Sequence, residues 1–131
     1  KGIRPYSRLI YSLEQKNPFY CFTRFESCTG AKALNNEIVD YYFGKQVKLF
    51  ETPGHTDDSL SFIVNDTIAI VGDVMVNAFG NIFPPFADDE EAVKISWRKL
   101  LDTQCELFCP SHGKPFHRDN LMKAYRKIHV E

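Results

Sequence analysis

The sequence of 131 residues has almost no net charge, because 16 lysines and arginines are balanced by 17 aspartates and glutamates. A protein that binds nucleic acid through its phosphates usually has a clear basic excess, so this balance argues against a nucleic-acid partner. No apolar run approaches the roughly 20 residues of a membrane-spanning helix, which argues against a membrane partner. The first residues, Lys1 to Pro5, lead into a mixed segment, so there is no sign of a signal peptide.

Cysteines at metal-binding spacing are also lacking. Cys21, Cys28, Cys105 and Cys109 form neither a zinc-finger pattern nor a Cys-x-x-Cys pair. Two disulfides or a thiolate metal site are the alternative, but reduced thiols packed as small hydrophobic side chains suit the sequence better. We therefore predict a cytoplasmic protein. Cys109 alone remains of interest for a site, because it lies three residues before His112.

An initiator methionine is missing as well. We expect that residue 1 is not the start of the gene product and that processing or truncation removed an upstream segment. The composition, with 44% hydrophobic and 25% charged residues, is that of a globular protein rather than a disordered one. The length fits a single domain, residues 1–131, with a sizeable core.

The hydrophobic pattern predicts short strands between helices. Helices are expected over residues 5–15, from Thr29-Gly30 to Gly44, after Asp88 to Leu101, and from Arg118 to about Val130. Strands are expected over residues 19–25, from Val47 to His55, and over 60–64, 67–71 and 106–109. The two-residue turn Asn65-Asp66 should join two of these strands in a hairpin. This order predicts the α/β (α+β) class, with a mixed sheet covered by helices.

Three turns that follow strands each carry one side chain able to bind a metal. His55 lies in Thr52-Pro53-Gly54-His55-Thr56, Asp73 follows Gly72, and His112 lies in Pro110-Ser111-His112-Gly113. Imidazole and carboxylate are ligands that zinc accepts. A carboxylate that ends an apolar strand is costly to bury unless it is paired or bound to metal.

Each of these residues also has a structural explanation. His55 could be a turn histidine bonded to a backbone carbonyl, Asp73 a cap or turn residue, and His112 a polar loop residue. Taken together, the three favour a metal site. Other residues have alternative interpretations. His117 caps the last helix, is solvated or reaches the mouth of the site, and Lys114 is solvated or contacts an anionic substrate. His129 is solvated, and Phe79, Phe83 and Phe86 line a pocket between Val74 and Phe86 or belong to the core.

With these motifs, the chain from about Val47 onward resembles the metallo-β-lactamase superfamily, including the glyoxalase II-like hydrolases. The resemblance implies half of an αββα sandwich. It implies that His55 completes the ligand set of a first metal, that Asp73 bridges two metals as the catalytic carboxylate, and that His112 binds the second metal. It also implies a dinuclear zinc hydrolase, with iron or manganese as alternatives. Water or hydroxide would attack a small-molecule ester, thioester, lactam or phosphoester.

The chain departs from the family pattern at two places. Asp57-Asp58-Ser59 stands where the family often has Pro-Gly-Ser, and no histidine precedes His55, so the family's His-x-His-x-Asp-His motif is missing. We expect the carboxyl-terminal part of a larger enzyme, with a metal site that is empty or partly occupied and no activity alone. A naturally degenerate relative is the alternative.

Two further hypotheses compete with an enzyme. The first is a non-catalytic binding or assembly domain of the same fold. Half a sandwich would expose an apolar sheet face, and a homodimer could cover it. The second is an unrelated α/β protein in which His55, Asp73 and His112 are ordinary loop residues.

Overall fold

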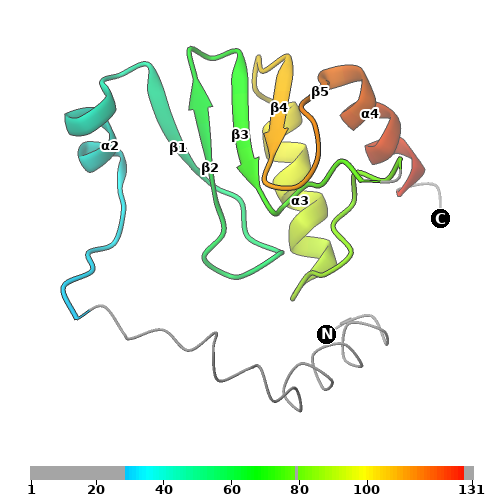
Figure 1. The fold of residues 1–131 in the computed structure, drawn as a ribbon, viewed down its shortest axis with the longest axis horizontal. Coiled ribbons are helices and arrows are strands. Elements are labelled where there is room, and N and C mark those ends of the chain that lie inside the picture. The colour runs from blue at the N-terminus through cyan, green and yellow to red at the C-terminus, as the bar shows by residue number, and fades with distance from the viewer. Residues whose placement is uncertain (1–28, 79, 129–131) are drawn as a thin grey trace.

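A five-stranded mixed sheet is the centre of the protein, in a computed structural model that describes residues 29–78 and 80–128 (Figure 1). Its strands lie in the order of the sequence: β1 (Val47–Glu51), β2 (Leu60–Val64), β3 (Ile68–Gly72), β4 (Leu107–Pro110) and β5 (Phe116–His117). All neighbours pair antiparallel except β3 and β4, which are parallel. The helices are α2 (Asn36–Phe43), α3 (Glu90–Leu101) and α4 (Arg118–Lys127). The predicted α+β class with a mixed sheet is confirmed.

Several predictions fall on residues that the structure does not describe. These are the helix over residues 5–15, the strand over 19–25, Cys21, Cys28, Phe79 and His129. Within residues 29–78 and 80–128, no helix combines the length and the apolar character needed to cross a membrane.

The hairpin between β2 and β3 follows the prediction closely. Asn65 and Asp66 have φ angles of 51° and 56°, and the Thr67 N–H donates to the Val64 carbonyl at 3.1 Å. Positive φ at both central residues is the type I′ turn, whose twist matches that of the flanking strands. The turn therefore fixes the register in which Phe62 faces Ile70.

Helix α2 begins later than predicted. Thr29-Gly30 does not open it, because the side-chain oxygen of Asn35 accepts the Ile38 N–H at 2.9 Å and caps the helix there. Gly44 ends it as expected, with φ 74° and its N–H donating to the Asp40 carbonyl.

Strand β1 ends at Glu51, not at His55 as predicted. The backbone leaves the sheet at Thr52, whose N–H donates to the Ser59 carbonyl at 3.0 Å, and the residues between them close a loop. His55 lies inside that loop.

The two-residue strand β5 was not predicted. It places His117 opposite Leu107, and His117 makes no side-chain capping bond to α4, so the proposed capping role is wrong. A pairing of only two residues has no hydrophobic period that a sequence could reveal.

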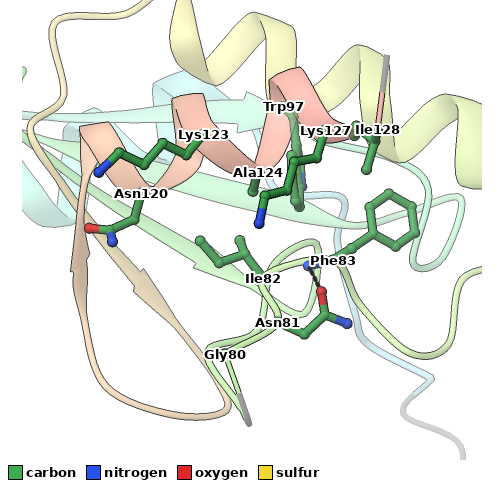
Figure 2. Close-up of a pocket in the computed structure, with 10 residues that line it drawn as sticks. All are labelled: Gly80, Asn81, Ile82, Phe83, Trp97, Asn120, Lys123, Ala124, Lys127 and Ile128. Carbon is green, nitrogen blue, oxygen red and sulfur yellow. Dashed lines mark hydrogen bonds between the residues drawn. The ribbon is translucent and has the colours of Figure 1, made fainter. Parts of the chain in front are cut away.

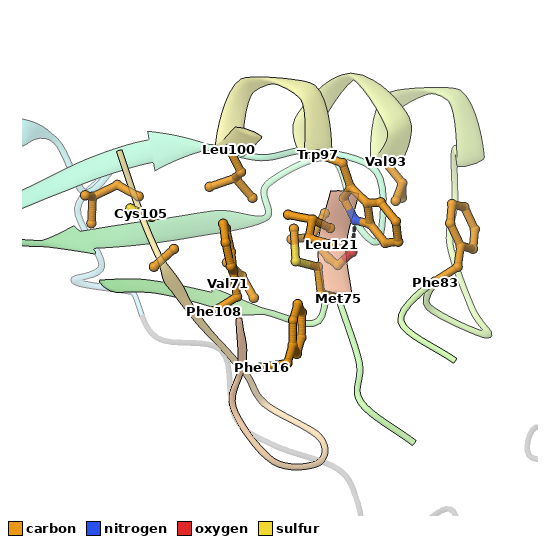
Figure 3. Packing of buried hydrophobic residues seen from close by; sticks show 13 residues of the cluster. Val71, Met75, Phe83, Val93, Trp97, Leu100, Cys105, Phe108, Phe116 and Leu121 are labelled. Carbon is orange, nitrogen blue, oxygen red and sulfur yellow. Dashed lines mark hydrogen bonds between the residues drawn. The ribbon is translucent and has the colours of Figure 1, made fainter. Parts of the chain in front are cut away.

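Helices α3 and α4 pack on one face of the sheet (Figure 3). From the helices come Val93, Trp97, Leu100 and Leu121, and from the sheet Ile63, Ala69, Val71 and Phe108, all at most 2% exposed. Each of the larger aliphatic or aromatic side chains contributes on the order of 1.5–3 kcal/mol by leaving water. The Trp97 Nε1–H also donates to the Val74 carbonyl at 2.8 Å.

The opposite face of the sheet is apolar but not fully buried. We call it the open face; its aliphatic and aromatic members are Val47, Leu49, Leu60, Phe62, Val64, Ile68, Ile70 and Leu107. The cross-strand pairs Phe62–Ile70 and Val64–Ile68 place these side chains on the same side. Ile70, in the middle of the sheet, is 47% exposed. Such a row of half-exposed aliphatic side chains is a surface that a partner could cover.

Candidate metal centre

Asp73 and His112 lie at the carboxyl ends of two parallel neighbours, β3 and β4. Gly72 pairs with Pro110, and the Ser111 N–H donates to the Gly72 carbonyl at 3.0 Å. This contact joins the two turns that follow the strands. His112 Nε2 consequently lies 3.5 Å from Asp73 Oδ1.

The Asp73 carboxylate has an oxygen without a hydrogen-bond partner. Oδ1 is buried, and the 3.5 Å contact with His112 Nε2 is too long for a charge-assisted hydrogen bond. A buried carboxylate oxygen normally accepts a hydrogen bond or binds a cation, since leaving it alone is costly. The side chain as a whole is 40% exposed, so solvent reaches the carboxylate group, although not Oδ1 itself. The atom therefore suits a metal ligand.

The His112 loop is held from the side by Asn77. The Asn77 N–H donates to the His112 carbonyl, and the Asn77 side-chain amide donates to the Lys114 carbonyl, both at 2.8 Å. Gly113 has φ 100°, and a Cβ there would lie 2.0 Å from the Asn77 carbonyl oxygen. Only glycine allows the backbone to come this close to Asn77, and this contact fixes the backbone next to His112.

His55 has one ring nitrogen engaged. Its Nδ1 lies 2.7 Å from the Phe86 carbonyl oxygen, and because a carbonyl can only accept, Nδ1 carries the hydrogen. This is the backbone contact that the structural explanation expected. It also leaves the Nε2 lone pair available, which is the tautomer of a metal-ligating histidine whose other nitrogen is held by the protein.

The loop that carries His55 is fastened to the start of α3. A Cβ on Gly54 would lie 2.4 Å from the Val93 nitrogen, so helix and loop are in close contact. The Asp88 and Asp89 N–H groups donate to the carbonyls of His55 and Gly54 at 3.1 and 3.0 Å. One turn further along α3, the Ser96 hydroxyl donates to the Pro53 carbonyl at 2.7 Å.

The segment Asp57-Asp58-Ser59, where the sequence departs from the family pattern, forms hydrogen bonds within this loop. The Thr56 hydroxyl donates to the Asp58 carboxylate at 2.8 Å and lies at the same distance from the Ser59 hydroxyl. Asp58 thus bonds within the loop.

The structure brings Asp73 and His112 together. Among residues 29–78 and 80–128, no group of three or more His, Cys, Asp or Glu side chains is arranged to hold a metal ion. His55 therefore does not join the other two in such a group here, and the ligand set His55, Asp73 and His112 stays a prediction.

The remaining candidates occupy different environments. Phe83 is buried against Trp97, with ring centroids 5.5 Å apart, whereas Phe86 is 40% exposed. Lys114 and His117 are exposed. Cys105 and Cys109 are free thiols, and burial raises the pKa of the Cys105 thiol. The expectation of a reduced, packed cysteine holds for Cys105, which is 0% exposed.

Sequence reasoning missed the residues that hold the candidate ligands. Asn77, Val93 and the Phe86 carbonyl carry no motif of their own. The only signal for such contacts was the glycine beside each histidine, Gly54 and Gly113.

No family model matches this sequence. The chain is 31% identical over 94 residues to a lactamase-like protein of Pestalotiopsis microspora, a match that covers 69% of this chain and 28% of that protein. The chain thus spans less than a third of the length of this curated relative.

Two solved structures resemble the fold. An archaeal metallo-β-lactamase superfamily protein from Sulfolobus tokodaii has a TM-score of 0.60 and 17% identity, covering 93% of this chain and 50% of that one. A metallo-β-lactamase family protein from Thermus thermophilus has a TM-score of 0.56 and 13% identity, covering 97% of this chain and 45% of that one. The similarity confirms the predicted fold.

Proposed function

We propose that this chain, which belongs to the metallo-β-lactamase superfamily, is the carboxyl-terminal part of a metal-dependent hydrolase. Members of this superfamily are generally hydrolases and typically bind metal ions. The observation that carries the proposal is the buried Asp73 Oδ1, which has no hydrogen-bond partner. It lies at the strand ends next to His112, where a divalent cation would satisfy it.

Imidazole and carboxylate are donors that zinc accepts, so we propose two zinc ions in the complete protein, with iron or manganese as alternatives. His55 would bind the first metal through Nε2, because the Phe86 carbonyl already holds Nδ1. Asp73 would bridge both metals, and His112 would bind the second. When bound, zinc supplies an acidified water as the nucleophile for an ester, thioester, lactam or phosphoester. The side chains of this chain hold and orient that site.

We further propose that the domain over residues 1–131 is incomplete without an amino-terminal half. The open face and the partial coverage of both solved structures support this, as does the absence of a histidine before His55. The missing half would supply further metal ligands and cover the open face. Alone, the chain would bind metal weakly, lack activity and form a homodimer through the open face. A cytoplasmic location is supported by the free thiols of Cys105 and Cys109.

A non-catalytic binding or assembly domain is the second candidate. It is favoured by one observation, that the described residues hold no group of three or more side chains arranged for a metal. In that case the open face, rather than Asp73, would be the functional surface.

The two candidates differ in the full-length gene product. We expect about two metal ions per chain by elemental analysis and turnover of a panel of chromogenic esters, thioesters, lactams and phosphoesters. Asp73→Asn should lower turnover by at least about 100-fold and reduce the metal content. Asp40→Asn, at an exposed position of α2 away from the candidate site, is the control for a lost surface carboxylate. A metal-free protein without turnover would overturn the hydrolase and favour the binding domain.

A further inference from the structure

A cavity of about 350 Å³ lies between α4 and the segment around residues 80–83 (Figure 2). Its apolar lining comes from three parts of the chain: Ile82 and Phe83, Trp97 of α3, and Ala124 and Ile128 at the end of α4. Trp97 and Phe83 are firmly placed, because they contact each other and the indole N–H is bonded to Val74. Their rings are almost fully buried, at 0% and 6% exposed, and form a rigid support behind the cavity.

The rim of the cavity is cationic. Lys123 and Lys127 stand one helical turn apart on α4, with Asn120 one turn before Lys123. Among the residues that the structure describes, no acidic side chain lines the cavity. Both lysines are exposed, and within residues 29–78 and 80–128 neither has an ion-pair partner. In Figure 2 the Lys127 side chain points from α4 toward Ile82. The chain has a net charge of −1, yet two lysines without ion-pair partners lie together at this cavity. Their local positive charge suits an anion.

We propose that this cavity binds a small amphipathic carboxylate. The apolar body of the ligand packs against Ile82, Ala124 and Ile128, which line the cavity and are only partly buried. Its carboxylate is held by Lys123 and Lys127, with the Asn120 amide as an additional donor. The volume lies at the lower end of the range for small-molecule sites, which limits the ligand to about the size of a phenylalkanoate.

The cavity is distinct from the candidate metal ligands. None of His55, Asp73 and His112 lines it. The two regions meet at a hairpin in which Val76 and Ala78 bond to Ile82 and Asn81, and which also carries the Asn77 that holds His112. Binding in the cavity does not depend on the proposed hydrolase activity, so the inference stands or fails by itself.

The test uses two probes with the same apolar body, 5-phenylpentanoate and its uncharged primary amide. Calorimetry measures binding to the 131-residue chain, and the fluorescence of Trp97, the single tryptophan, locates it. We expect saturable binding of the carboxylate with a change in Trp97 emission, and binding of the amide about tenfold weaker. The double variant Lys123→Gln/Lys127→Gln should bind the carboxylate no better than the amide.

The matched control is Lys45→Gln/Lys99→Gln, which removes the same charge from exposed positions outside the cavity. It should leave carboxylate binding within about twofold of wild type, because distant surface charges are screened. Ala124→Phe fills the cavity and keeps both lysines, so it should abolish binding of both probes. Absence of binding, equal affinity for acid and amide, or equal loss in the two lysine variants would each overturn the proposal.

Discussion

The Asn77 carbonyl oxygen occupies the space that a side chain at Gly113 would need, since a Cβ there would lie 2.0 Å away. The Asn77 N–H meanwhile holds the carbonyl of His112, the preceding residue. A candidate metal ligand is thus placed by contacts of its neighbours with a segment far away in the sequence.

Gly113→Ala should disturb the His112 loop. The new methyl group has to displace Asn77, and φ 100° is unfavourable for alanine, so we expect a loss of at least about 2 kcal/mol in the free energy of unfolding. Urea denaturation measures it. Gly80→Ala is the control, because Gly80 also has positive φ (75°) but open space around its Cβ position, and should cost only about 1 kcal/mol. Equal losses would show that the contact with Asn77 is unimportant.

Asp73→Asn should leave the metal-free chain as stable as wild type or up to about 1 kcal/mol more stable. The substitution removes a charge whose Oδ1 is buried without a partner. It should also remove any rise in melting temperature on adding zinc, since a ligand stabilises only the state that binds it. Thermal unfolding with zinc and with a chelator tests both points. A zinc-dependent rise that survives the substitution would place the metal elsewhere.

Ile70→Lys should convert the isolated chain from dimer to monomer. A lysine in the middle of the open face, at a position 47% exposed, cannot be buried in a dimer without a charge partner. Light scattering after gel filtration measures the mass. Ile95→Lys on α3 is the matched control, since Ile95 is 59% exposed on the other layer and should leave the dimer intact. A wild-type chain that is monomeric would contradict the dimer directly.

Cys105 should resist alkylation in the folded protein. Burial raises the pKa of its thiol, so little reactive thiolate forms at mildly alkaline pH, whereas Cys109 is half-buried and should react first. Mass spectrometry of peptides after brief iodoacetamide treatment distinguishes the two. Because the folded pKa lies above the unfolded value, this thiol favours folding fully below the unfolded pKa, and the contribution is lost as the pH rises through the folded pKa. Faster labelling of Cys105 would contradict its burial.

Local chemistry made part of the fold predictable. The Asn65-Asp66 turn is determined by residue types that accept positive φ, and Leu60–Val64 was located because turn residues bound an apolar run on both sides. Strand β5 depends on a partner brought beside it by the tertiary fold. The start of α2 depended on which of several polar residues supplied the cap, and only Asn35 does so.

For the candidate site too, local motifs predicted part of the arrangement and not the rest. The motifs named His55, Asp73 and His112, and the parallel pairing of β3 and β4 brings two of them together. What holds them, the Phe86 carbonyl and Asn77, comes from the irregular segment after Asp73, where no period or motif indicates a contact.

Helix α3 forms hydrogen bonds with both the segment before His55 and the segment after Asp73. Its consecutive residues Ser96 and Trp97 bond to Pro53, close before His55, and to Val74, just after Asp73. The distance between these two turns is therefore set by one rigid helix rather than by the loops themselves. Insertions in the loops could change what enters the site while the distance between imidazole and carboxylate stayed the same.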